Sequence, residues 1–310
     1  MKEILNTTFL IALLSASIRL SVPILLAALG GMYSERAGIV NIGLEGIMLV
    51  GAFAGVVGSY FSGSQWIGAL LAMVSGMLIA YLFAITTVKI KMNQIVSGVA
   101  INMLGIGLTS FLFRALFGIT TVPITVKSFS VYNVPILSKI PILGEVFFKQ
   151  TPLVYIAFLL VPISSYILYK TSWGLNIRTV GEYPMAADTV GINVDRVRII
   201  CVVVSGLLAG LAGCFLSLGQ FNMFVDNMVS GRGFIAVAAV IFGKWNPKGI
   251  LMASLIFGIA DALQIRLQIA DIGIPYQFLL MFPYLLTVIA VTGIVGKTVS
   301  PKALGNPYVK

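Results

Sequence analysis

Charged and amide side chains inside otherwise apolar stretches are the residues of this sequence whose types are suited to chemistry. The densest group is Asn41 and Glu45, in the run Asn-Ile-Gly-Leu-Glu-Gly at residues 41–46. On a helix that rises about 1.5 Å per residue, Glu45 would lie roughly a dozen ångströms from the helix end, too deep to reach water easily. A carboxylate and an amide at that depth can bind a polar ligand. The alternative is structural: Glu45 pairs with Arg19 or caps a broken helix.

Further polar residues are candidates for the same pathway through the membrane. Asn102, Asp261 and Gln264 each interrupt an apolar stretch, and Asp226 precedes a short apolar run. Asn102 has the alternative role of an interhelical hydrogen bond, and Asp261 that of an ion pair with Arg266. The candidate pathway residues are therefore Asn41, Glu45, Asn102, Asp226, Asp261 and Gln264.

Several kinds of catalytic and metal chemistry have no support in the sequence. It contains no His, which excludes a His-based metal site, a His general base and a Ser-His-Asp triad. Cys201 and Cys214 would lie on one helix, roughly 20 Å apart at 1.5 Å per residue, and cannot pair with each other. No cysteine cluster has metal-ligand spacing. We therefore expect no enzyme activity, no metal and no cofactor bound by this chain.

The overall composition is that of an integral membrane protein. Of the 310 residues, 59% are hydrophobic and 10% are charged, and the mean hydropathy is +1.04. We predict an all-α polytopic fold of about nine (eight to ten) membrane-spanning helices, since several apolar stretches reach the ~20 residues that a crossing needs. A single transmembrane domain would occupy residues 1–310. The predicted spans are residues 9–30, 38–61, 65–88, 93–117, 152–169, 199–219, 234–242, 250–268 and 277–295.

One predicted span is anomalous, and small residues predict how the others pack. Residues 234–242 are too few to cross the hydrocarbon core, so they form either part of a tilted span or a re-entrant half-helix. Glycines recur at helical spacing in two other spans, which predicts close helix–helix approach. These glycines are Gly51 and Gly55 in one span, and Gly206, Gly210 and Gly213 in another.

The formal net charge of +10 lies mostly at the ends of the apolar stretches. The charges form no basic face interleaved with aromatic residues, so nucleic acid is not an expected partner, whereas orientation by cytoplasmic Lys and Arg is. Placing residues 170–198 and the C-terminal tail in the cytoplasm makes all crossings alternate, with the N-terminus outside. Residues 118–151 then form an extracytoplasmic loop. We predict a multi-pass protein of the cell membrane.

The cytoplasmic loop at residues 170–198 is the most continuously polar part of the chain. Pro184 suits the first position of a helix, and Gly191 suits the left-handed residue that ends one. The predicted helix has about two turns, which is too short to be stable alone in water. We expect it to dock on a soluble partner.

Three motifs resemble those of one permease family of ABC importers, which handles simple sugars, nucleosides and branched-chain amino acids. The first covers residues 25–49 and contains Ser-Glu-Arg-Ala-Gly-Ile-Val-Asn-Ile-Gly-Leu-Glu-Gly, and the third covers residues 231–249. The second is the cytoplasmic loop, which is similar to T-x-x-G-x-x-(I/L)-R-A-x-G-E-N-P-x-A-A-x-x-x-G-(I/V). Its matching positions are Thr171, Gly174, Ile177, Arg178, Gly181, Glu182, Pro184, Ala186, Ala187, Gly191 and Ile192. The sequence departs from the pattern at Thr179 and Tyr183, where the family has Ala and Asn.

The resemblance implies a fold like that of type II ABC importer permeases and a set of partners. The cytoplasmic loop would be a coupling helix that fits a groove on a separate ABC ATPase, which hydrolyses ATP in place of this chain. A second, homologous permease would complete a heterodimer, and an extracytoplasmic lipoprotein would deliver the substrate. The cell membrane would be a bacterial one. The residues that the resemblance assigns to ATPase coupling are Arg178, Gly181, Glu182, Pro184, Ala186, Ala187 and Gly191.

The substrate implied by the resemblance is a nucleoside, because the first motif looks most like the nucleoside branch of the family. A simple sugar such as ribose is the alternative within the family. An ion-coupled secondary transporter is an alternative from another class, in which Glu45 and Asp261 would bind protons or sodium. That alternative leaves the short docking helix without a role.

Overall fold

Helices make up nearly all of the regular structure in the computed structural model, which describes residues 7–118, 123–135, 138, 140, 143–269, 277, 278, 281, 285 and 299–309. In chain order the helices are α1 (Thr7–Arg36), α2 (Leu44–Ser62), α3 (Gln65–Ala84), α4 (Gln94–Phe117), α5 (Leu143–Phe147), α6 (Pro152–Lys170), α7 (Ser172–Glu182), α8 (Pro184–Thr189), α9 (Val194–Cys214), α10 (Arg232–Phe242) and α11 (Pro247–Ile269). Helices α3 and α9 each continue into a π-helical stretch, η1 (Ile85–Lys89) and η3 (Phe215–Phe221). Strands β1 (Tyr132–Asn133) and β2 (Lys149–Gln150) form an antiparallel pair outside the bundle.

Among the described residues, seven helices are long and apolar enough to cross a membrane, so the protein is a multi-pass membrane protein. They are α1, α2, α3 with η1, α4, α6, α9 with η3, and α11. The expected count of about nine is slightly too high for this part of the chain. Helix α10 has 11 residues, about 17 Å at 1.5 Å per residue, which is roughly half of the hydrocarbon core. Most of the predicted span at residues 277–295 lies outside the described residues.

Helix boundaries differ from the prediction where the chain breaks inside the membrane. Helix α1 continues through Glu35 to Arg36, so the loop expected at residues 32–37 is mostly helical. Residues 38–43, predicted as the start of the second span, are not helical, and α2 begins only at Leu44. We call residues 37–43 the 37–43 segment. The polar loop at residues 170–198, predicted to be cytoplasmic, contains α7 in addition to the short helix that its sequence predicts.

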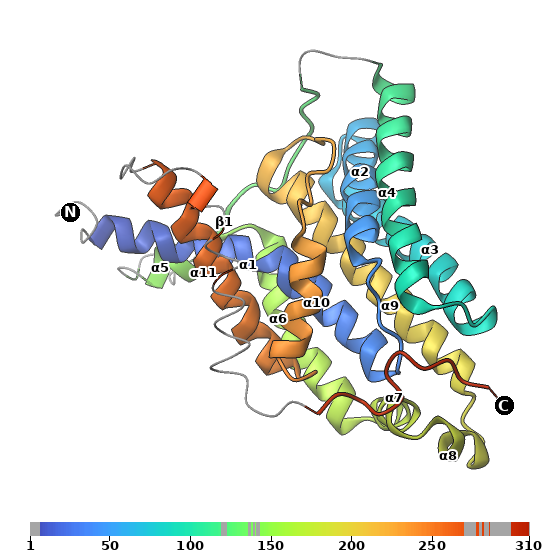
Figure 1. Cartoon of the computed structure of the whole chain (residues 1–310). Coiled ribbons are helices and arrows are strands. Elements are labelled where there is room, and N and C mark those ends of the chain that lie inside the picture. The colour runs from blue at the N-terminus through green and yellow to red at the C-terminus, as the bar shows by residue number, and fades with distance from the viewer. Residues whose placement is uncertain are drawn as a thin grey trace.

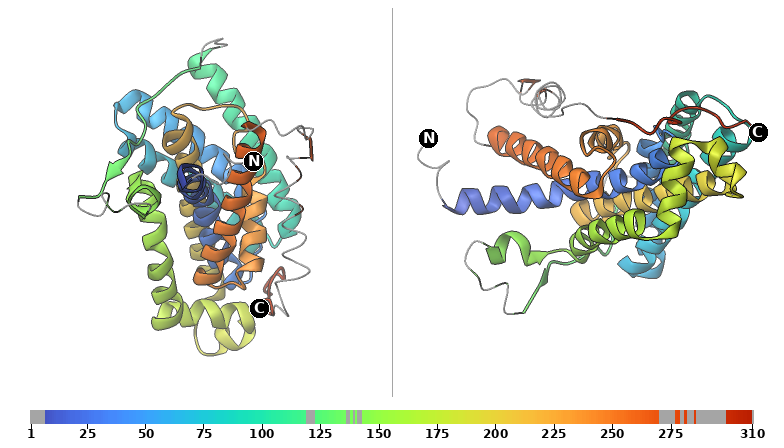
Figure 2. Two further views of the ribbon diagram at one scale, coloured as in Figure 1. Left: turned by 90° about the vertical axis from the view of Figure 1, so that its left-hand side faces the viewer. Right: turned by 90° about the horizontal axis from the view of Figure 1, so that it is seen from below.

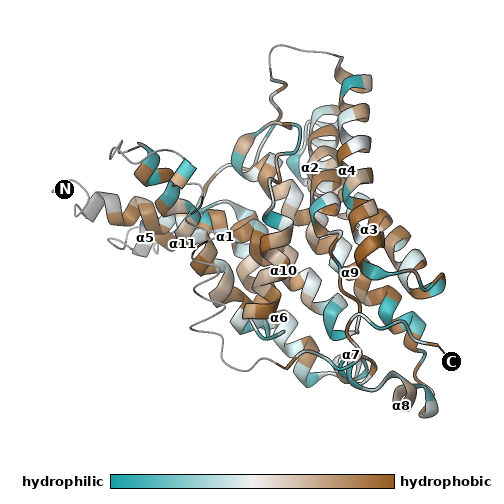
Figure 3. Cartoon of the chain, viewed as in Figure 1, coloured by the Kyte–Doolittle hydropathy of each residue, from teal (hydrophilic) through white to brown (hydrophobic). Residues whose placement is uncertain are grey.

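The two ends of the bundle differ in what they carry. Helices α7 and α8 and the C-terminal residues lie at one end, and the start of α1 lies with α5 at the opposite end (Figures 1 and 2). Hydrophilic residues gather at the turns of both ends, whereas the helices between them are mainly hydrophobic (Figure 3). This distribution fits a bundle whose ends face water on either side of a bilayer.

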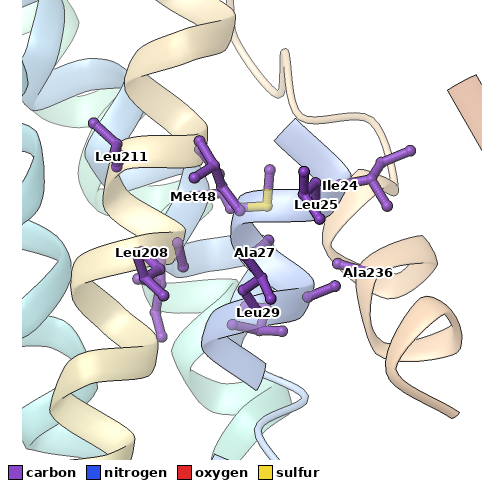
Figure 4. Close-up of a cluster of buried hydrophobic side chains, with 14 of the residues drawn as sticks. Ile24, Leu25, Ala27, Leu29, Met48, Leu208, Leu211 and Ala236 are labelled. Atoms are coloured by element: carbon purple, nitrogen blue, oxygen red, sulfur yellow. The ribbon is translucent and has the colours of Figure 1, made fainter. Parts of the chain in front are cut away.

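The core forms where α1, α2, α9 and α10 pack together. Ile24, Leu25, Ala27 and Leu29 of α1 lie against Met48 of α2, Leu208 and Leu211 of α9, and Ala236 of α10 (Figure 4). The predicted glycine contacts are present in this region. A methyl group on Gly51 of α2 would lie 2.5 Å from the Cα atom of Gly210 on α9, so only glycine permits the two backbones to approach this closely.

Candidate functional site

Backbone groups in the middle of the 37–43 segment lie in the interior outside any helix, and side chains from α4 form hydrogen bonds with some of them. The N–H of Val40 donates to Gln94 Oε1 at 2.8 Å. Asn102 accepts from the N–H of Gly46 at 2.8 Å and donates to the carbonyl of Ile42 at 3.1 Å. Asn102 thus forms hydrogen bonds with backbone groups of the 37–43 segment and of the first turn of α2. The structure therefore contains the interhelical hydrogen bond that was the alternative role for Asn102.

Glu45 joins the first turn of α2 to the start of α10. One carboxylate oxygen accepts from the N–H of Gly231 and the other from the N–H of Gly233, both at 2.7 Å. Glu45 is only 6% exposed. Its negative charge therefore lies at the partially positive N-termini of both helices, which stabilises a carboxylate without a salt bridge. Of the two structural roles considered for Glu45, capping a broken helix is observed, whereas Arg19 is exposed on α1.

Helix α10 begins inside the bundle, and the residues before it form no helix. Residues 222–231, the 222–231 segment, lead to its N-terminus through left-handed backbone at Asn222, Asn227, Ser230 and Gly231. Two broken helices, α2 and α10, thus meet at their N-terminal ends. The anomalous short run in the sequence is therefore a half-helix rather than a complete span.

A positive charge lies beside the Glu45 contact. The guanidinium of Arg232, at the first residue of α10, acts electrostatically on both Glu45 and Asp261 of α11. Arg232 also donates to the carbonyl of Val229 at 3.2 Å. The structure thus brings Asp261 close to Arg232, a residue that the sequence analysis did not consider. Gln264, one turn further along α11, is half-buried.

The remaining predicted pathway residues differ in their surroundings. Asn41 is fully buried and donates through Nδ2 to Ser205 Oγ at 3.1 Å, while its Oδ1 accepts no hydrogen bond from the described part of the chain. An unpaired buried acceptor is costly, so this oxygen is available to a ligand that donates. Asp226 is exposed in the 222–231 segment, where it accepts from Ser110 of α4 at 2.9 Å. Asp226 is therefore separate from the Glu45 group.

Helices α7 and α8 form the candidate surface for a cytoplasmic partner. Helix α8 has Pro184 at its first position, and Gly191 follows it with φ of +86°, as the sequence predicts. Tyr183, Met185 and Val190 are 56%, 71% and 75% exposed. They adjoin a groove of about 380 Å³ lined by Leu175, Arg178, Thr179, Glu182, Tyr183, Ala186, Ala187, Val190 and Ile192. A large exposed apolar group at a helix pair is typical of a protein interaction site.

The seven predicted coupling residues are not equivalent in the structure. Ala186 and Gly191 are exposed, and Arg178, Glu182 and Pro184 are half-buried. Gly181 and Ala187 are buried inside this chain, with Ala187 only 2% exposed. Gly181 therefore lies beneath this surface, and Ala187 contributes only to the floor of the groove. The sequence motif did not single out Met185 or Val190, because the pattern leaves both positions unspecified.

The C-terminal residues fasten this surface to the 37–43 segment. The N–H of Ala303 donates to the carbonyl of Gly181 at 2.9 Å, and the N–H of Gly305 donates to that of Gly38 at 3.0 Å. Arg198 of α9, only 1% exposed, donates from Nε to the carbonyl of Ala37 and from Nη1 to that of Asn306, each at 3.1 Å. Sequence analysis gave no sign of this arrangement, since the partner residues are far apart in the chain.

Two further hydrogen bonds connect the end of α1 to the turn after α10. Trp245 Nε1 donates to the buried carboxylate of Glu35 at 2.6 Å, and Arg36 Nε donates to the carbonyl of Trp245 at 3.0 Å. Lys244 and Trp245 both adopt positive φ, 55° and 51°, which is rare for residues other than glycine. The half-helix is thus held at both ends, at its start by Glu45 and beyond its end by Glu35.

Fold and site together define a multi-pass membrane protein. Helices α2 and α10 both begin inside its bundle, and α7 and α8 present exposed apolar side chains at one end. Residues 13–291 match the family described as "Branched-chain amino acid transport system / permease component". The chain belongs to this family, which confirms the permease class that the three motifs predict.

Several curated relatives match over most of their length. The Guanosine ABC transporter permease protein NupQ of Bacillus subtilis is 43% identical, over 95% of this chain and 95% of that protein. The Nucleoside ABC transporter permease protein NupC of Lactococcus lactis is 40% identical, over 94% of each. TsgC13 of Haloferax volcanii, whose name refers to a glucose ABC transporter permease, is 40% identical over 84% of this chain and 79% of that protein.

A more distant kind of relative comes from one of the same organisms. The Guanosine ABC transporter permease protein NupP of Bacillus subtilis is 26% identical, over 76% of this chain and 70% of that protein. That bacterium thus has two guanosine permease proteins similar to this chain, and NupQ is much more similar to it than NupP is.

Proposed function

We propose that this chain is a permease subunit of an ATP-driven importer of nucleosides. Its 43% identity to a guanosine permease over 95% of both chains carries the nucleoside assignment. The chain forms part of the substrate path and binds no cofactor, because ATP is hydrolysed by a separate ATPase. Its cellular place is the membrane of a bacterium.

The ATPase docks on the surface formed by α7 and α8. Tyr183, Met185 and Val190 present apolar area there, and the adjoining groove has the half-buried Arg178 and Glu182 in its wall. Burial of exposed apolar side chains gives such an interface most of its affinity. Lys302 lies over the ring of Tyr183, with its Nζ atom 4.5 Å from the ring centroid, whereas Met185 and Val190 are 71% and 75% exposed and are the main apolar area open to a partner. ATP-driven closure of the ATPase pair then pushes on the α7–α8 unit.

Movement of that unit reaches the interior through hydrogen bonds of the C-terminal stretch and of Arg198. In the C-terminal stretch, the N–H of Ala303 donates a hydrogen bond to the carbonyl of Gly181, and the N–H of Gly305 donates one to the carbonyl of Gly38. Arg198 ties Ala37 to the same C-terminal stretch. Because Ala37 and Gly38 are the first two residues of the 37–43 segment, a displacement at the surface acts directly on the stretch that leads into α2.

Two alternating arrangements of the broken helices would give the substrate access from one side and then the other. In the observed arrangement Glu45 holds the N-termini of α2 and α10 together. Asn102 contacts the backbone at the start of α2, and Asp261 faces the charge of Arg232 at the start of α10. We propose that these residues, with Asn41 and Gln264, form transient hydrogen bonds with a neutral polar nucleoside. Weak, replaceable contacts suit transport, because a tightly held substrate would not leave.

The remaining partners are a second permease and an extracytoplasmic binding lipoprotein. Bacillus subtilis has both NupQ and NupP as guanosine permease proteins, which supports a heterodimer of two related permeases. We place the 222–231 segment and the described residues of the predicted 118–151 loop at the outer end, where a binding protein delivers its ligand.

The test is ATP hydrolysis by the assembled importer in lipid nanodiscs. The assembly holds this chain, its co-permease, the ATPase subunits and the binding protein, the latter loaded with guanosine, ribose or leucine. We expect guanosine-loaded binding protein to stimulate hydrolysis severalfold over the unloaded protein, and ribose and leucine to do nothing. If only the ribose-loaded binding protein stimulated hydrolysis, the chain would still be an importer subunit, but its substrate would be a sugar. The similarity to TsgC13 is the observation that favours a sugar.

A further inference from the structure

The outer half of α4 carries a groove that the proposed coupling path does not use. Its volume is about 560 Å³, and its lining residues are Gly107, Ser110, Phe111, Arg114, Ala115 and Gly118. The ring of Phe111 is 68% exposed. At Gly107, one turn before Phe111, a methyl group would meet no atom within 4 Å, so the space beside the ring is open. We call this feature the α4 groove.

A polar cluster forms one edge of the α4 groove. Ser110 Oγ donates to Asp226 Oδ1 at 2.9 Å, and Arg114 Nη2 lies 3.9 Å from Asp226 Oδ2. The side chains of Arg114 and Asp226 are 67% and 50% exposed. The edge therefore offers both donors and acceptors to a ligand, while its two charges cancel.

Aromatic packing on the opposite face of α4 fixes this cluster in place. The ring of Phe113 lies 5.3 Å from that of Phe224 in the 222–231 segment, and Phe224 lies 5.6 Å from Phe53 of α2. Phe224 is buried and precedes Asp226 by two residues. The segment that supplies Asp226 is thus anchored against α4 rather than placed there by its ion pair alone.

The composition of the exposed α4 face differs from that of a lipid-facing helix. On α3 the strongly exposed side chains include Leu70, Leu71, Leu78 and Leu82, which suit hydrocarbon. The exposed side chains on the outer half of α4 also include apolar ones such as Phe111 and Leu116, but here Ser110 and Arg114 follow the open position at Gly107 by about one and two turns. Polar and charged groups within spans face protein or a water-filled path in preference to lipid. The two polar side chains beside the open glycine position thus suit a water-filled path better than hydrocarbon.

We propose that the α4 groove is an outer transit site for a nucleoside, in which the base stacks on Phe111 and the ribose hydroxyls bond to Asp226, Ser110 and Arg114. This proposal rests on the proposed nucleoside substrate. Stacking on an aromatic ring accepts every base, as a permease for several nucleosides requires. The balanced charge of Arg114 and Asp226 suits a neutral polar ligand, since neither charge is left unpaired when the site empties.

Cysteine accessibility tests whether the groove is aqueous and occupied by substrate. The native Cys201 and Cys214 are both 0% exposed, so they give little background. In the assembled importer, a membrane-impermeant charged thiol reagent is applied to the Gly107→Cys variant, and modification of this chain is read by mass spectrometry. The Leu78→Cys variant on α3 is the lipid-facing control.

We expect Gly107→Cys to react, Leu78→Cys to stay unmodified, and guanosine to slow the reaction at Gly107→Cys at least severalfold. No reaction at Gly107→Cys would overturn the proposal, because the face would then contact lipid or the co-permease. Reaction without protection by any nucleoside would overturn it as well. A third outcome is that ribose protects Gly107→Cys and the wild-type importer transports no nucleoside. That result would contradict the proposed substrate, but the α4 groove would still be a transit site.

A second pair of variants tests the aromatic contact. Phe111→Leu keeps an apolar side chain but removes the stacking face, so uptake at low guanosine concentration should fall roughly tenfold, while Phe111→Tyr should retain it. Phe61→Leu is the control, because Phe61 is 69% exposed at the end of α2 and does not line the groove. Equal uptake by Phe111→Leu and Phe61→Leu would exclude stacking at Phe111.

Discussion

Both side-chain oxygens of Glu45 accept backbone hydrogen bonds, from Gly231 and Gly233. Asn102 likewise commits its oxygen to Gly46 and its nitrogen to Ile42. These two residues hold the breaks in α2 and α10, and a ligand reaches their polar atoms only in competition with the backbone. Asn41 differs because its Oδ1 accepts no bond from the described residues. Of these three residues, Asn41 is therefore the one with a buried acceptor that no described residue occupies.

Glu45→Gln is the substitution that tests the junction at the residue scale. The Gln amide would present a donor to the N–H of Gly231 or Gly233, and the lost charge would no longer balance two helix N-termini. An unsatisfied buried donor costs about 1–3 kcal/mol. We expect a lower melting temperature of the purified chain and a loss of most uptake.

Glu145→Gln is the matched control for that substitution, because Glu145 is exposed and forms an ion pair with Lys149 one turn away. Exposed pairs of this kind contribute about 0.5 kcal/mol or less. If Glu45→Gln matched wild type in melting temperature and uptake, the capping role of Glu45 would be wrong.

At the scale of elements, the α7–α8 surface acts as a docking unit, and Val190→Asp tests it. Val190 is 75% exposed, so a charge there leaves this chain intact but disrupts an apolar interface. We expect at least a tenfold loss of ATP-driven uptake and weaker co-purification of the ATPase, with an unchanged melting temperature. Val131→Asp, on the outer loop at 51% exposure, is the control. Full uptake with bound ATPase in Val190→Asp would contradict the docking role.

Ala187 is unsuited to this test although the family motif includes it. It is 2% exposed, and its carbonyl accepts from the N–H of Ile192 at 3.0 Å. An aspartate there would bury an unpaired charge and disturb α8 itself. Loss of uptake in such a variant would therefore report misfolding of the helix as readily as loss of docking.

Several elements could be predicted from the sequence because their signals are local. Asn93 caps α4 by accepting from Ile95 and Val96, and Pro152 begins α6, so both helices start within a residue of the predicted positions. Helix α8 is similar, with Pro184 before it and Gly191 after it. Each of these signals lies within a few residues of the boundary that it sets.

The breaks in α2 and α10 could not be predicted in the same way, since their partners are distant in the sequence. The 37–43 segment is apolar enough to continue a helix, but Gln94 and Asn102 supply its missing hydrogen bonds from α4. Helix α7 escaped prediction because one face is buried and the other is polar, so the loop as a whole reads as polar. The sequence analysis considered that Glu45 caps a broken helix, but it did not predict that the capped N–H groups include that of Gly231.

At the scale of the whole molecule, Arg198 connects the cytoplasmic surface with the membrane interior. It donates to Ala37 at the start of the broken segment and to Asn306 in the C-terminal stretch. Arg198→Lys keeps the positive charge but replaces the planar guanidinium with a single ammonium group. We therefore expect at most one of the two hydrogen bonds, to Ala37 or to Asn306, to remain. We expect the variant to retain its ATPase subunits but to move fewer guanosine molecules per ATP hydrolysed.

Arg196→Lys is the control for Arg198→Lys, because Arg196 lies on the same first turns of α9 and is exposed. Uptake and hydrolysis are measured together in proteoliposomes, so that their ratio reports coupling. A wild-type ratio in Arg198→Lys would mean that the C-terminal stretch is a structural support only.

The central claim is that this chain moves nucleosides with energy from ATP, and the most direct test is uptake of labelled guanosine. Proteoliposomes would hold the complete importer, with ATP supplied to the ATPase side or with a proton or sodium gradient alone. The account predicts uptake that requires ATP, survives collapse of both gradients and is blocked by other nucleosides but not by leucine. Uptake that ignores ATP and follows an ion gradient would contradict it, and would make Glu45 and Asp261 the ion sites of a secondary transporter.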